Sequence, residues 1–443
     1  MENNLPEGWE EVELSFLVDY KKGKKPKRME NKPFNGSLVY LDIRAIEKKN
    51  DEIFVDAETS NATDENELIV VWDGARAGWV GKSRKGALGS TLMGLRPKID
   101  RDYLYRFIQT QFDYLQTNHR GTGIPHVDPD IFWNIKVPVA PEAEQQRIVA
   151  KLDELMEKID SSRARLERIP KILKRFRQSI LSAAVSESGD PTNTEQICEI
   201  IQIGPFGTQL HKHDYISNGI PLINPTHIQA GQVTPDSDYT ISKRKFQELS
   251  NYHLKEGDVI MGRRGEMARC ALIGDKEDGW LCGTGSLFFR PNKKLITPQY
   301  LYWLLSNSNT KEFLESESKG TTMSNLNLSI AKRVPIFLPP IVEQERIVNR
   351  VEQLFSLADK IEARYTKAKA QVDKLPQCLL AKAFRGELVP HDEKDEPAGV
   401  LLERINKDRS KASSKRYDKK DEETELAELR FLAEPAKIYQ KKR

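Results

Sequence analysis

The stretch EQQRIV, residues 144–149, returns almost unchanged as EQERIV, residues 343–348, with five of the six positions identical. The copies lie 199 residues apart, from Glu144 to Glu343, whereas stacked small repeats recur at roughly 20 to 50 residues. A spacing of this size suits a domain rather than a small repeat. The pattern therefore predicts two domain-sized halves related by duplication.

The match continues at the same offset without a gap for about 45 residues, and it pairs Pro141 with Pro340 and Gln178 with Gln377. Outside this part the halves align only in short pieces, some at the same offset and some at slightly smaller ones. The chain is therefore predicted to be a tandem duplication that is well kept in one segment and eroded elsewhere.

Apolar residues in the well-kept segment alternate spacings of four and three, which is the heptad pattern of a coiled coil. They are Ile148, Leu152, Leu155, Ile159, Ser162, Leu166, Ile169, Leu173, Phe176 and Ile180, and in the second copy Ile347, Val351, Leu354, Ala358, Ile361, Tyr365, Ala368, Val372, Leu375 and Leu379. Such a period requires a partner helix, and the other copy is the obvious one. We expect antiparallel pairing, with parallel pairing as the alternative, and a kink or break near Pro170 and Pro376.

The remaining segments mix short strand-like runs with turns rich in Gly, Pro and Asn, which predicts α+β domains. Examples are SLVYLDI (37–43), ELIVVW (67–72) and DVIMG (258–262). The predicted fold is α+β, with two pseudo-symmetric α/β domains separated by two long helices that form an antiparallel coiled coil. The predicted boundaries are 1–140 and 189–339 for the domains, 141–188 and 340–386 for the helices, and 387–443 for a charged, mobile tail.

Composition limits the possible functions. The net charge is only +3, so any nucleic-acid surface has to be local. No run of about 18 apolar residues occurs and the N-terminus has no signal-peptide pattern, so we expect no membrane partner and a cytoplasmic location. Four cysteines without CxxC spacing are expected to be reduced thiols, and no metal site is expected.

Three motifs that could carry chemistry fail on inspection. GWVGKS (78–83) ends like a phosphate-binding loop, but Arg76 stands where its first glycine belongs. NPTH (224–227) and DPDIF (128–132) lack the second proline of the base-holding loop of amino-methyltransferases. A nuclease built on scattered carboxylates is left as a minor alternative, and the sequence favours a binding protein over an enzyme.

Basic clusters lie in turn-rich segments of both halves, where phosphate positioning and contacts to base edges would need them. The candidate DNA-binding residues are Lys21, Lys22, Lys24, Lys25, Lys27, Arg28, Lys82, Arg84, Lys85, Arg120, His211, Lys212, His213, Arg263, Arg264 and Lys319. Arg263 and Arg264 could grip guanine with two hydrogen bonds. The pair His211 and His213 is expected to be polar loop surface rather than a metal site.

The repeated P-x-x-EQ-x-RIV helix openings, together with KRFRQSIL (174–181), LAKAFRGEL (380–388) and GPFGTQL (204–210), give the chain a known pattern. It resembles the specificity subunit of a type I restriction–modification system, up to about residue 387. The resemblance implies that residues 1–140 and 189–339 are target-recognition domains that each read half of a bipartite site in double-stranded DNA, with the helices as a ruler.

The resemblance also implies the partners. Two methyltransferase (modification) subunits would bind S-adenosylmethionine and methylate one adenine in each half-site, and restriction subunits would translocate DNA with ATP and Mg²⁺. This chain would itself hold no cofactor and catalyse nothing. An orphan DNA-binding scaffold without a methyltransferase partner is the alternative.

Residues kept in both copies are candidates for contact with a partner that is present twice. They are Glu144, Gln145, Arg147, Val149 and Leu181, with Glu343, Gln344, Arg346, Val348 and Leu380 in the second copy. Each has two open interpretations: packing against its own globular domain, or a surface for the methyltransferase subunits. For the acids, capping of the helix N-terminus is a third.

Overall fold

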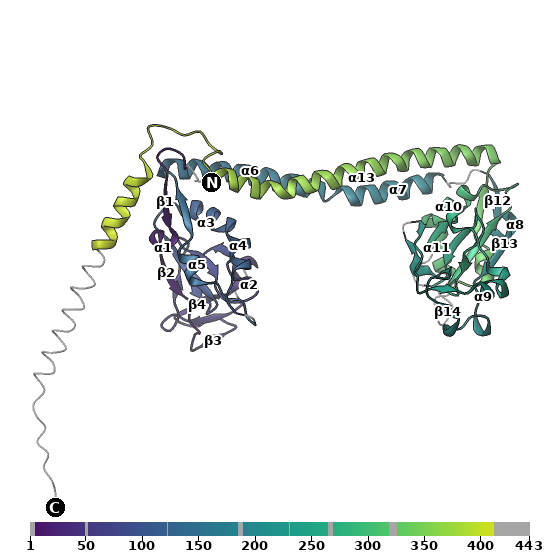
Figure 1. Cartoon of the computed structure of the whole chain (residues 1–443), viewed down its shortest axis with the longest axis horizontal. Helices are drawn as coiled ribbons and strands as arrows, with labels where there is room; N and C mark the ends of the chain where they lie inside the picture. The colour runs from purple at the N-terminus through teal and green to yellow at the C-terminus, as the bar shows by residue number, and fades with distance from the viewer. Residues whose placement is uncertain are drawn as a thin grey trace, which may run out of the picture. The chain divides into compact units, whose positions relative to one another are not determined.

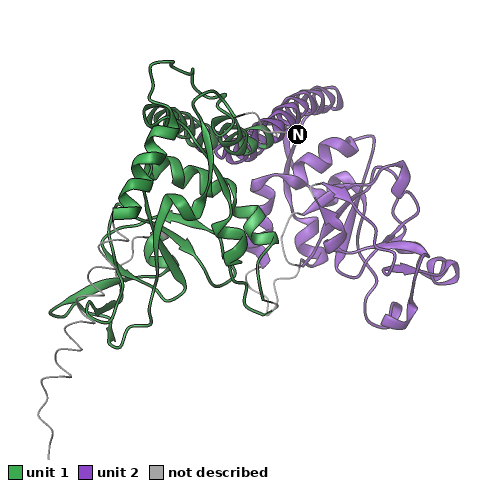
Figure 2. Ribbon diagram, turned by 60° about the vertical axis from the view of Figure 1, so that its left-hand side comes forward, with its two compact units in different colours: residues 1–163, 370–443 green, residues 164–369 purple. Residues whose placement is uncertain are grey.

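The computed structural model describes residues 5–48, 52–121, 123–184, 189–229, 231–264, 269–318 and 326–411. The chain forms two compact units, one of residues 1–163 with 370–443 and the other of residues 164–369 (Figure 2). Each unit contains one sheet-rich domain and helix from both halves of the chain. The α+β class predicted from the sequence is confirmed.

The first domain is built on an antiparallel sheet in the order β2-β10-β7-β8. Its strands are β2 (Val18–Lys22), β10 (Leu92–Pro97), β7 (Leu68–Val71) and β8 (Val80–Lys82). All of β7 is buried because alternate side chains enter two different cores. Leu68 and Val70 pack in the larger core, and Ile69 and Val71 pack in the smaller one.

A second sheet of this domain has the order β3-β5-β4-β9-β6, with β4 parallel to β9. Its strands are β3 (Met29–Glu30), β5 (Phe54–Asp56), β4 (Ser37–Leu41), β9 (Gly86–Leu88) and β6 (Ala62–Thr63). Strand β1 (Glu10–Glu13) pairs with β11 (Lys136–Val139). The helices are α1 (Leu14–Leu17), α2 (Ile43–Lys48), α3 (Arg101–Thr110), α4 (Phe112–Thr117) and α5 (Pro129–Trp133).

The second domain repeats this order as β13-β22-β19-β20. These strands are β13 (Cys198–Ile203), β22 (Ser286–Pro291), β19 (Val259–Gly262) and β20 (Cys270–Leu272). The neighbouring sheet, β14-β18-β15-β21, again holds one parallel pair, β15 with β21. The order of strands therefore confirms the duplication predicted from the sequence.

The other elements of the second domain are short strands, helices and 3-10 turns. Its strands are β14 (Tyr215–Ile216), β18 (Thr240–Ile241), β15 (Ile220–Ile223), β21 (Leu281–Cys282), the pair β12 (Asp190–Asn193) and β23 (Pro335–Leu338), and the pair β16 (Ile228–Gln229) and β17 (Gln232–Val233). Its helices are α8 (Thr194–Ile197), α9 (Lys243–Glu248), α10 (Pro298–Ser306), α11 (Ser308–Ser318) and α12 (Leu328–Lys332), with 3-10 turns η1 (Gly207–Gln209), η2 (Lys212–Asp214), η3 (Pro225–His227), η4 (Ser250–Tyr252) and η5 (Asp275–Glu277).

An ion pair between an arginine and a buried carboxylate is kept at the same place in both main sheets. Arg96 at the end of β10 donates to the buried Glu67 at 2.9 Å, and Arg290 on β22 donates to the buried Asp258 at 2.7 Å. Each carboxylate directly precedes the strand that we call the central strand of its domain, which is β7 in the first domain and β19 in the second. Because an unpaired charge there would be costly, the pair fixes the register of the two strands.

Three long helices carry the heptad pattern, namely α6 (Glu142–Leu166), α7 (Ile169–Ala184) and α13 (Ile341–Ala383). The break expected near Pro170 is present between α6 and α7, whereas α13 continues through Pro376 without ending. The seam is mostly buried or half-buried. Its exposed members are Ser162, Ile361 and Leu375.

The pairing is antiparallel within each unit (Figure 1). In the first unit the beginning of α6 and the end of α13 share one core, through Ile148 and Leu380, and Arg163 pairs with Asp373 at 3.3 Å. In the second unit the beginning of α13 packs into the domain core through Val348. The end of α7 meets the same domain at α10 and α11, so the two helices run in opposite directions there as well.

Residues 387–411 correct the prediction of a mobile tail over this part. Residues 398–411 form a helix whose Ala398, Leu401 and Ile405 are buried in the core of the first domain. These residues are spaced three and four apart, so one apolar stripe of the helix faces the domain. The rest of the predicted tail, 412–443, lies outside the described residues.

Among the residues that the structure describes, no helix is both long and apolar enough to cross a membrane.

Candidate nucleic-acid interface

Two glycines press a loop against a turn at the same place in each domain. A side-chain carbon on Gly23, directly after β2, would lie 1.9 Å from the Gly89 carbonyl oxygen. One on Gly204, directly after β13, would lie 1.9 Å from the Gly283 carbonyl oxygen. Glycine alone permits such an approach of two backbones.

The same turn also holds the residue that follows the central strand. The backbone N–H of Trp72 donates to the Thr91 carbonyl at 2.8 Å, and that of Arg263 donates to the Gly285 carbonyl at 3.0 Å. Three segments therefore meet in each domain. We call residues 22–28, 72–73 and 89–91 the loop face of the first domain, and residues 203–209, 263–264 and 283–285 the loop face of the second.

Positive charge on the first loop face comes from the segment after β2. Its exposed cations are Lys24, Lys25, Lys27 and Arg28, together with Lys22 at the end of β2. Of these, Lys22 pairs with Asp73 and Arg28 pairs with Glu30. The segment after the central strand adds no cation. Its Trp72 is buried against Phe132, and its Asp73 is an acid that pairs with Lys22 at 3.0 Å.

Positive charge on the second loop face comes from the other segment. Here the loop after β13 reads GPFG and exposes the ring of Phe206 to 61%, and the cations are Arg263 and Arg264 after β19. Arg263 donates from Nε to the Leu326 carbonyl at 3.0 Å. Burial, and next the charge of Arg264, lower the pKa of the Arg263 guanidinium.

Asn224 also lies at the second loop face. In the sequence it belongs to the NPTH motif, which was rejected as a methyltransferase loop. Its side-chain oxygen accepts from the Gly285 backbone N–H at 3.3 Å, and its neighbour Pro225 packs against Gly262 and Gly285. Phe206 was also not among the predicted site residues. An alignment of KG (22–23) with IG (203–204) would have indicated both loops. The offset between the two copies is smaller there, however, than the offset of the helices.

Several other predicted cations are engaged within the first domain. Lys21 pairs with the buried Glu67 at 2.7 Å, and Lys82 pairs with Asp102 at 3.1 Å. Arg84 donates to the Ala45 carbonyl at 3.1 Å. Their charge therefore serves the fold at least in part.

Arg120 and Lys85 are the remaining predicted cations of the first domain. The backbone of Arg120 pairs with His126, which also pairs with Asp73 of the loop face. Arg120 pairs with Asp128 and Asp130, both at 2.6 Å, which offsets its charge locally. Lys85 is exposed beside a hollow of about 400 Å³ that also has Asp64 and Glu65 in its wall. Neither of these two environments favours a phosphate as strongly as the loop face does.

In the second domain, His211, Lys212 and His213 are exposed at η2, with the two imidazole rings stacked 5.2 Å apart. The neighbouring Asp214 accepts from the His211 backbone N–H and faces Lys245. Among the described residues no group of His, Cys, Asp and Glu side chains could hold a metal ion. Lys319 lies outside the described residues.

Residues 6–171 and 192–370 match the family model described as the type I restriction modification DNA specificity domain. The chain belongs to this family. It is a specificity subunit of the type I restriction–modification kind, a DNA-recognition protein that does not itself catalyse a reaction.

Relatives of known type span nearly the whole specificity subunit. The type I restriction enzyme StySPI specificity subunit of Salmonella potsdam is 30% identical over 94% of this chain and 98% of its own length. The EcoKI specificity subunit of Escherichia coli K12 is 28% identical, with the same coverage of both chains.

Solved structures share the fold. A chain from a study of complex assembly and conformational transition of the type I R-M system has a TM-score of 0.66, with 20% identity over 87% of this chain and 99% of that one. The HsdS subunit of Thermoanaerobacter tengcongensis has a TM-score of 0.60, with 20% identity over 86% of this chain and 98% of that one.

In this specificity subunit the glutamine of each helix opening anchors the helix to a domain. The buried Gln145 accepts from the Asp100 backbone N–H at 3.1 Å and donates to the Ala140 carbonyl at 2.8 Å. The buried Gln344 makes the equivalent bonds to Thr297 and Pro339. As candidate contacts to a partner both glutamines are wrong, because their side chains are enclosed by this chain.

The acids and arginines of the two openings differ between the copies. Glu144 is buried, where Trp9 donates to it at 3.2 Å, whereas Glu343 is half-buried. Arg147 pairs with Asp395 of the C-terminal segment at 2.5 Å, whereas Arg346 is 81% exposed and lies 3.5 Å from Glu343. The copies thus keep the residues but not their surroundings.

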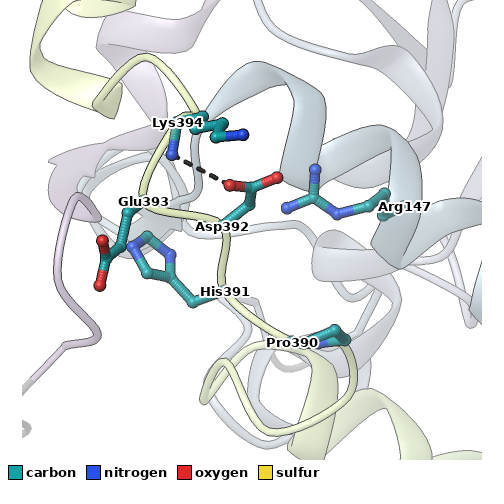
Figure 3. A pocket seen from close by; sticks show the side chains of 6 residues that line it. All are labelled: Arg147, Pro390, His391, Asp392, Glu393 and Lys394. Atoms are coloured by element: carbon teal, nitrogen blue, oxygen red, sulfur yellow. Dashed lines mark hydrogen bonds between the residues drawn. The ribbon is translucent and has the colours of Figure 1, made fainter.

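A hollow of about 480 Å³ lies beside Arg147 and is lined otherwise by residues 390–394 of the C-terminal segment. Figure 3 shows the side chains that line it. In the specificity subunit this segment pairs with Arg147 through Asp395 but leaves the Arg147 side chain 36% exposed. Both interpretations of Arg147 therefore stay open.

The retained apolar residues are largely used for packing. Val348 and Leu380 are buried, and Val149 and Leu181 are half-buried. Leu380 packs into the first domain rather than the domain that precedes its own helix, because the helices are antiparallel.

Proposed function

We propose that this specificity subunit recognises a bipartite DNA target, one half with each domain. The observation that carries the proposal is the loop face, which has one backbone scaffold in both domains but places its cations on different segments. Different bases require different donors and acceptors. Two domains on one scaffold with unlike side chains therefore suit a target with two unlike halves.

Two methyltransferase subunits with S-adenosylmethionine would dock around the chain and methylate one adenine in each half-site. Restriction subunits that use ATP and Mg²⁺ would join them in the cytoplasm. The half-buried Glu343 and exposed Arg346 remain candidates for such docking. In this proposal the paired helices act as the ruler between the half-sites, and the chain supplies position rather than chemistry.

Co-expression with a methyltransferase subunit tests this assignment. We expect a stable complex that transfers methyl groups from S-adenosylmethionine to adenine in genomic DNA only when this chain is present. DNA affinity of the complex should fall steeply with salt because phosphate contacts release counterions. A chain that binds DNA but neither assembles with a methyltransferase nor directs methylation would instead be an orphan scaffold.

A further inference from the structure

The loop after β13 differs in chemistry from the loop after β2, although both leave the sheet through the same backbone contact. Gly23 and Gly204 each press against a carbonyl of the neighbouring turn, so the residues that follow them can be compared in order. Two residues beyond these glycines stand Lys25 in the first domain and Phe206 in the second, both of them exposed. The scaffold therefore requires neither a cation nor an aromatic ring at this position.

The chain is fixed on both sides of Phe206. Pro205 before it is buried, and Leu210 after it is buried in a core that includes Tyr252. The Tyr252 hydroxyl also donates to the side-chain oxygen of Gln209 at 2.8 Å. The ring of Phe206 is nevertheless 61% exposed, so a well-anchored loop holds a large apolar group in solvent.

The location of Phe206 indicates what this ring meets. Single exposed apolar side chains are common on protein surfaces, so exposure alone assigns no role. The Gly204 N–H donates to the Ser286 carbonyl and the Arg263 N–H donates to the Gly285 carbonyl, both at 3.0 Å, so the Phe206 loop and the Arg263 segment are tied to one turn. On the loop face of a DNA-recognition domain, cations suit phosphates and an aromatic ring suits bases.

Two tyrosines add to the aromatic character of the second loop face. Tyr239 is 45% exposed and meets the ring of Tyr215 edge to face at 5.8 Å. Burial raises the pKa of Tyr215, whereas hydrogen bonds from Thr284 and Asn224, both at this loop face, act against the rise. Tyr215 therefore touches the same turn that holds the Phe206 loop.

We infer that the ring of Phe206 stacks against a base of the half-site read by the second domain, at the position where the first domain places Lys25 on a phosphate. The inference rests on the proposed function. Phenylalanine side chains can enter an opened base step of duplex DNA, and every base offers a flat face to an aromatic ring. The two loops then hold DNA by different forces, one by charge and the other by stacking.

The test measures the affinity of the assembled complex for a duplex that carries the methylation motif of the wild type, over a range of salt concentrations. Phe206→Ala should lower the affinity roughly fivefold to hundredfold with an unchanged salt dependence, because stacking releases no counterions. Phe206→Trp should keep most of the affinity, because it keeps an aromatic face. Lys25→Ala should instead make the salt slope shallower by about one phosphate contact.

Leu295→Ala is the matched control and should bind as the wild type does. Leu295 is an apolar residue of the same domain with 41% exposure, and it follows the end of β22 that lies away from the turn at 283–285. Wild-type affinity of Phe206→Ala would overturn the inference. Wild-type affinity of Phe206→Leu would do so as well, because an apolar contact would then suffice without a ring.

A Phe206→Ala chain that folds but no longer assembles with the methyltransferase subunit would also contradict the inference, because it would place the ring at a contact between subunits. Failure of the proposed function would be seen separately and before any variant is made, as a wild-type complex without a two-part motif.

Discussion

Glycine at positions 23 and 204 brings two backbones closer than any other residue permits, and the loop faces depend on it. The obstacle to a side chain at Gly23 is the carbonyl of Gly89, which belongs to the backbone and cannot rotate away. The position of the exposed lysines after β2 therefore depends on Gly23, which itself has no functional side chain.

Gly23→Ala should destabilise the protein by about 1–3 kcal/mol and weaken DNA binding, because the loop that carries Lys24 and Lys25 must move away from its turn. Urea unfolding and a DNA-binding titration measure the two effects. Gly399→Ala is the matched control, because the nearest atom to its new methyl group lies 3.8 Å away. Equal stability of the two variants would show that the contact is not tight.

Arg290→Met should cost roughly 3–5 kcal/mol, because it leaves the buried Asp258 carboxylate without its cation. Arg333→Met removes one partner of an exposed pair with Glu317 and should cost below about 1 kcal/mol. Thermal unfolding of both variants distinguishes the two environments. Similar losses would contradict the structural role assigned to the buried pair.

At the scale of single residues the sequence predicted only part of the candidate site. It indicated Arg263 and Arg264 as a pair of cations in a loop, but it could not show that Lys21 and Arg120 have carboxylate partners 46 and 8 residues away in the sequence. Charge in a sequence does not reveal whether it is already compensated. Only the three-dimensional positions of Glu67, Asp128 and Asp130 do so.

Among the elements, the C-terminal segment departs furthest from its prediction. Its dense charge suggested a mobile tail, yet Ala398, Leu401 and Ile405 form a short apolar stripe that the sequence already contained. The stripe was missed because three apolar residues among many charges look weak without the surface that receives them. That surface belongs to the other end of the chain, at Trp9.

Arg147→Glu should release residues 387–411 from the first unit by placing two negative charges together, and the double variant Arg147→Glu with Asp395→Arg should restore the contact. Limited proteolysis detects the release as faster cleavage in the segment. Arg346→Glu is the matched control, because Arg346 has no such partner segment among the described residues. Equal cleavage of all these variants would argue against the Arg147 contact.

The same contact should depend on pH. Hydrogen bonds from Arg147 lower the pKa of the Asp395 carboxyl in the folded protein. Its stabilising contribution is therefore complete above the usual pKa of an aspartate and is lost as the pH falls through the lowered value. The protection factors for amide exchange of residues 398–411, which are corrected for the intrinsic pH dependence of exchange, should fall in acid before those of the domain sheet. In Asp395→Asn this early fall in acid should be absent.

For the whole molecule, the duplication and the antiparallel helices followed from the heptad spacing and the repeated helix opening, since both are local patterns that insertions have not disturbed. The correspondence of the loop faces did not follow from the offset of the helices, because loops of unequal length shift the register between the domains. The order β2-β10-β7-β8 and its repeat β13-β22-β19-β20 recover that register. With that register the two domains show a pattern of kept glycines and exchanged charges.

The central claim is that these two readers recognise two unlike half-sites, and mapping of N6-methyladenine in a genome that expresses this chain with its methyltransferase subunit tests it most directly. We expect one motif with two different defined parts, a fixed number of unspecified positions between them and one methylated adenine in each part. A single continuous motif, or a gap of variable length, would contradict the account.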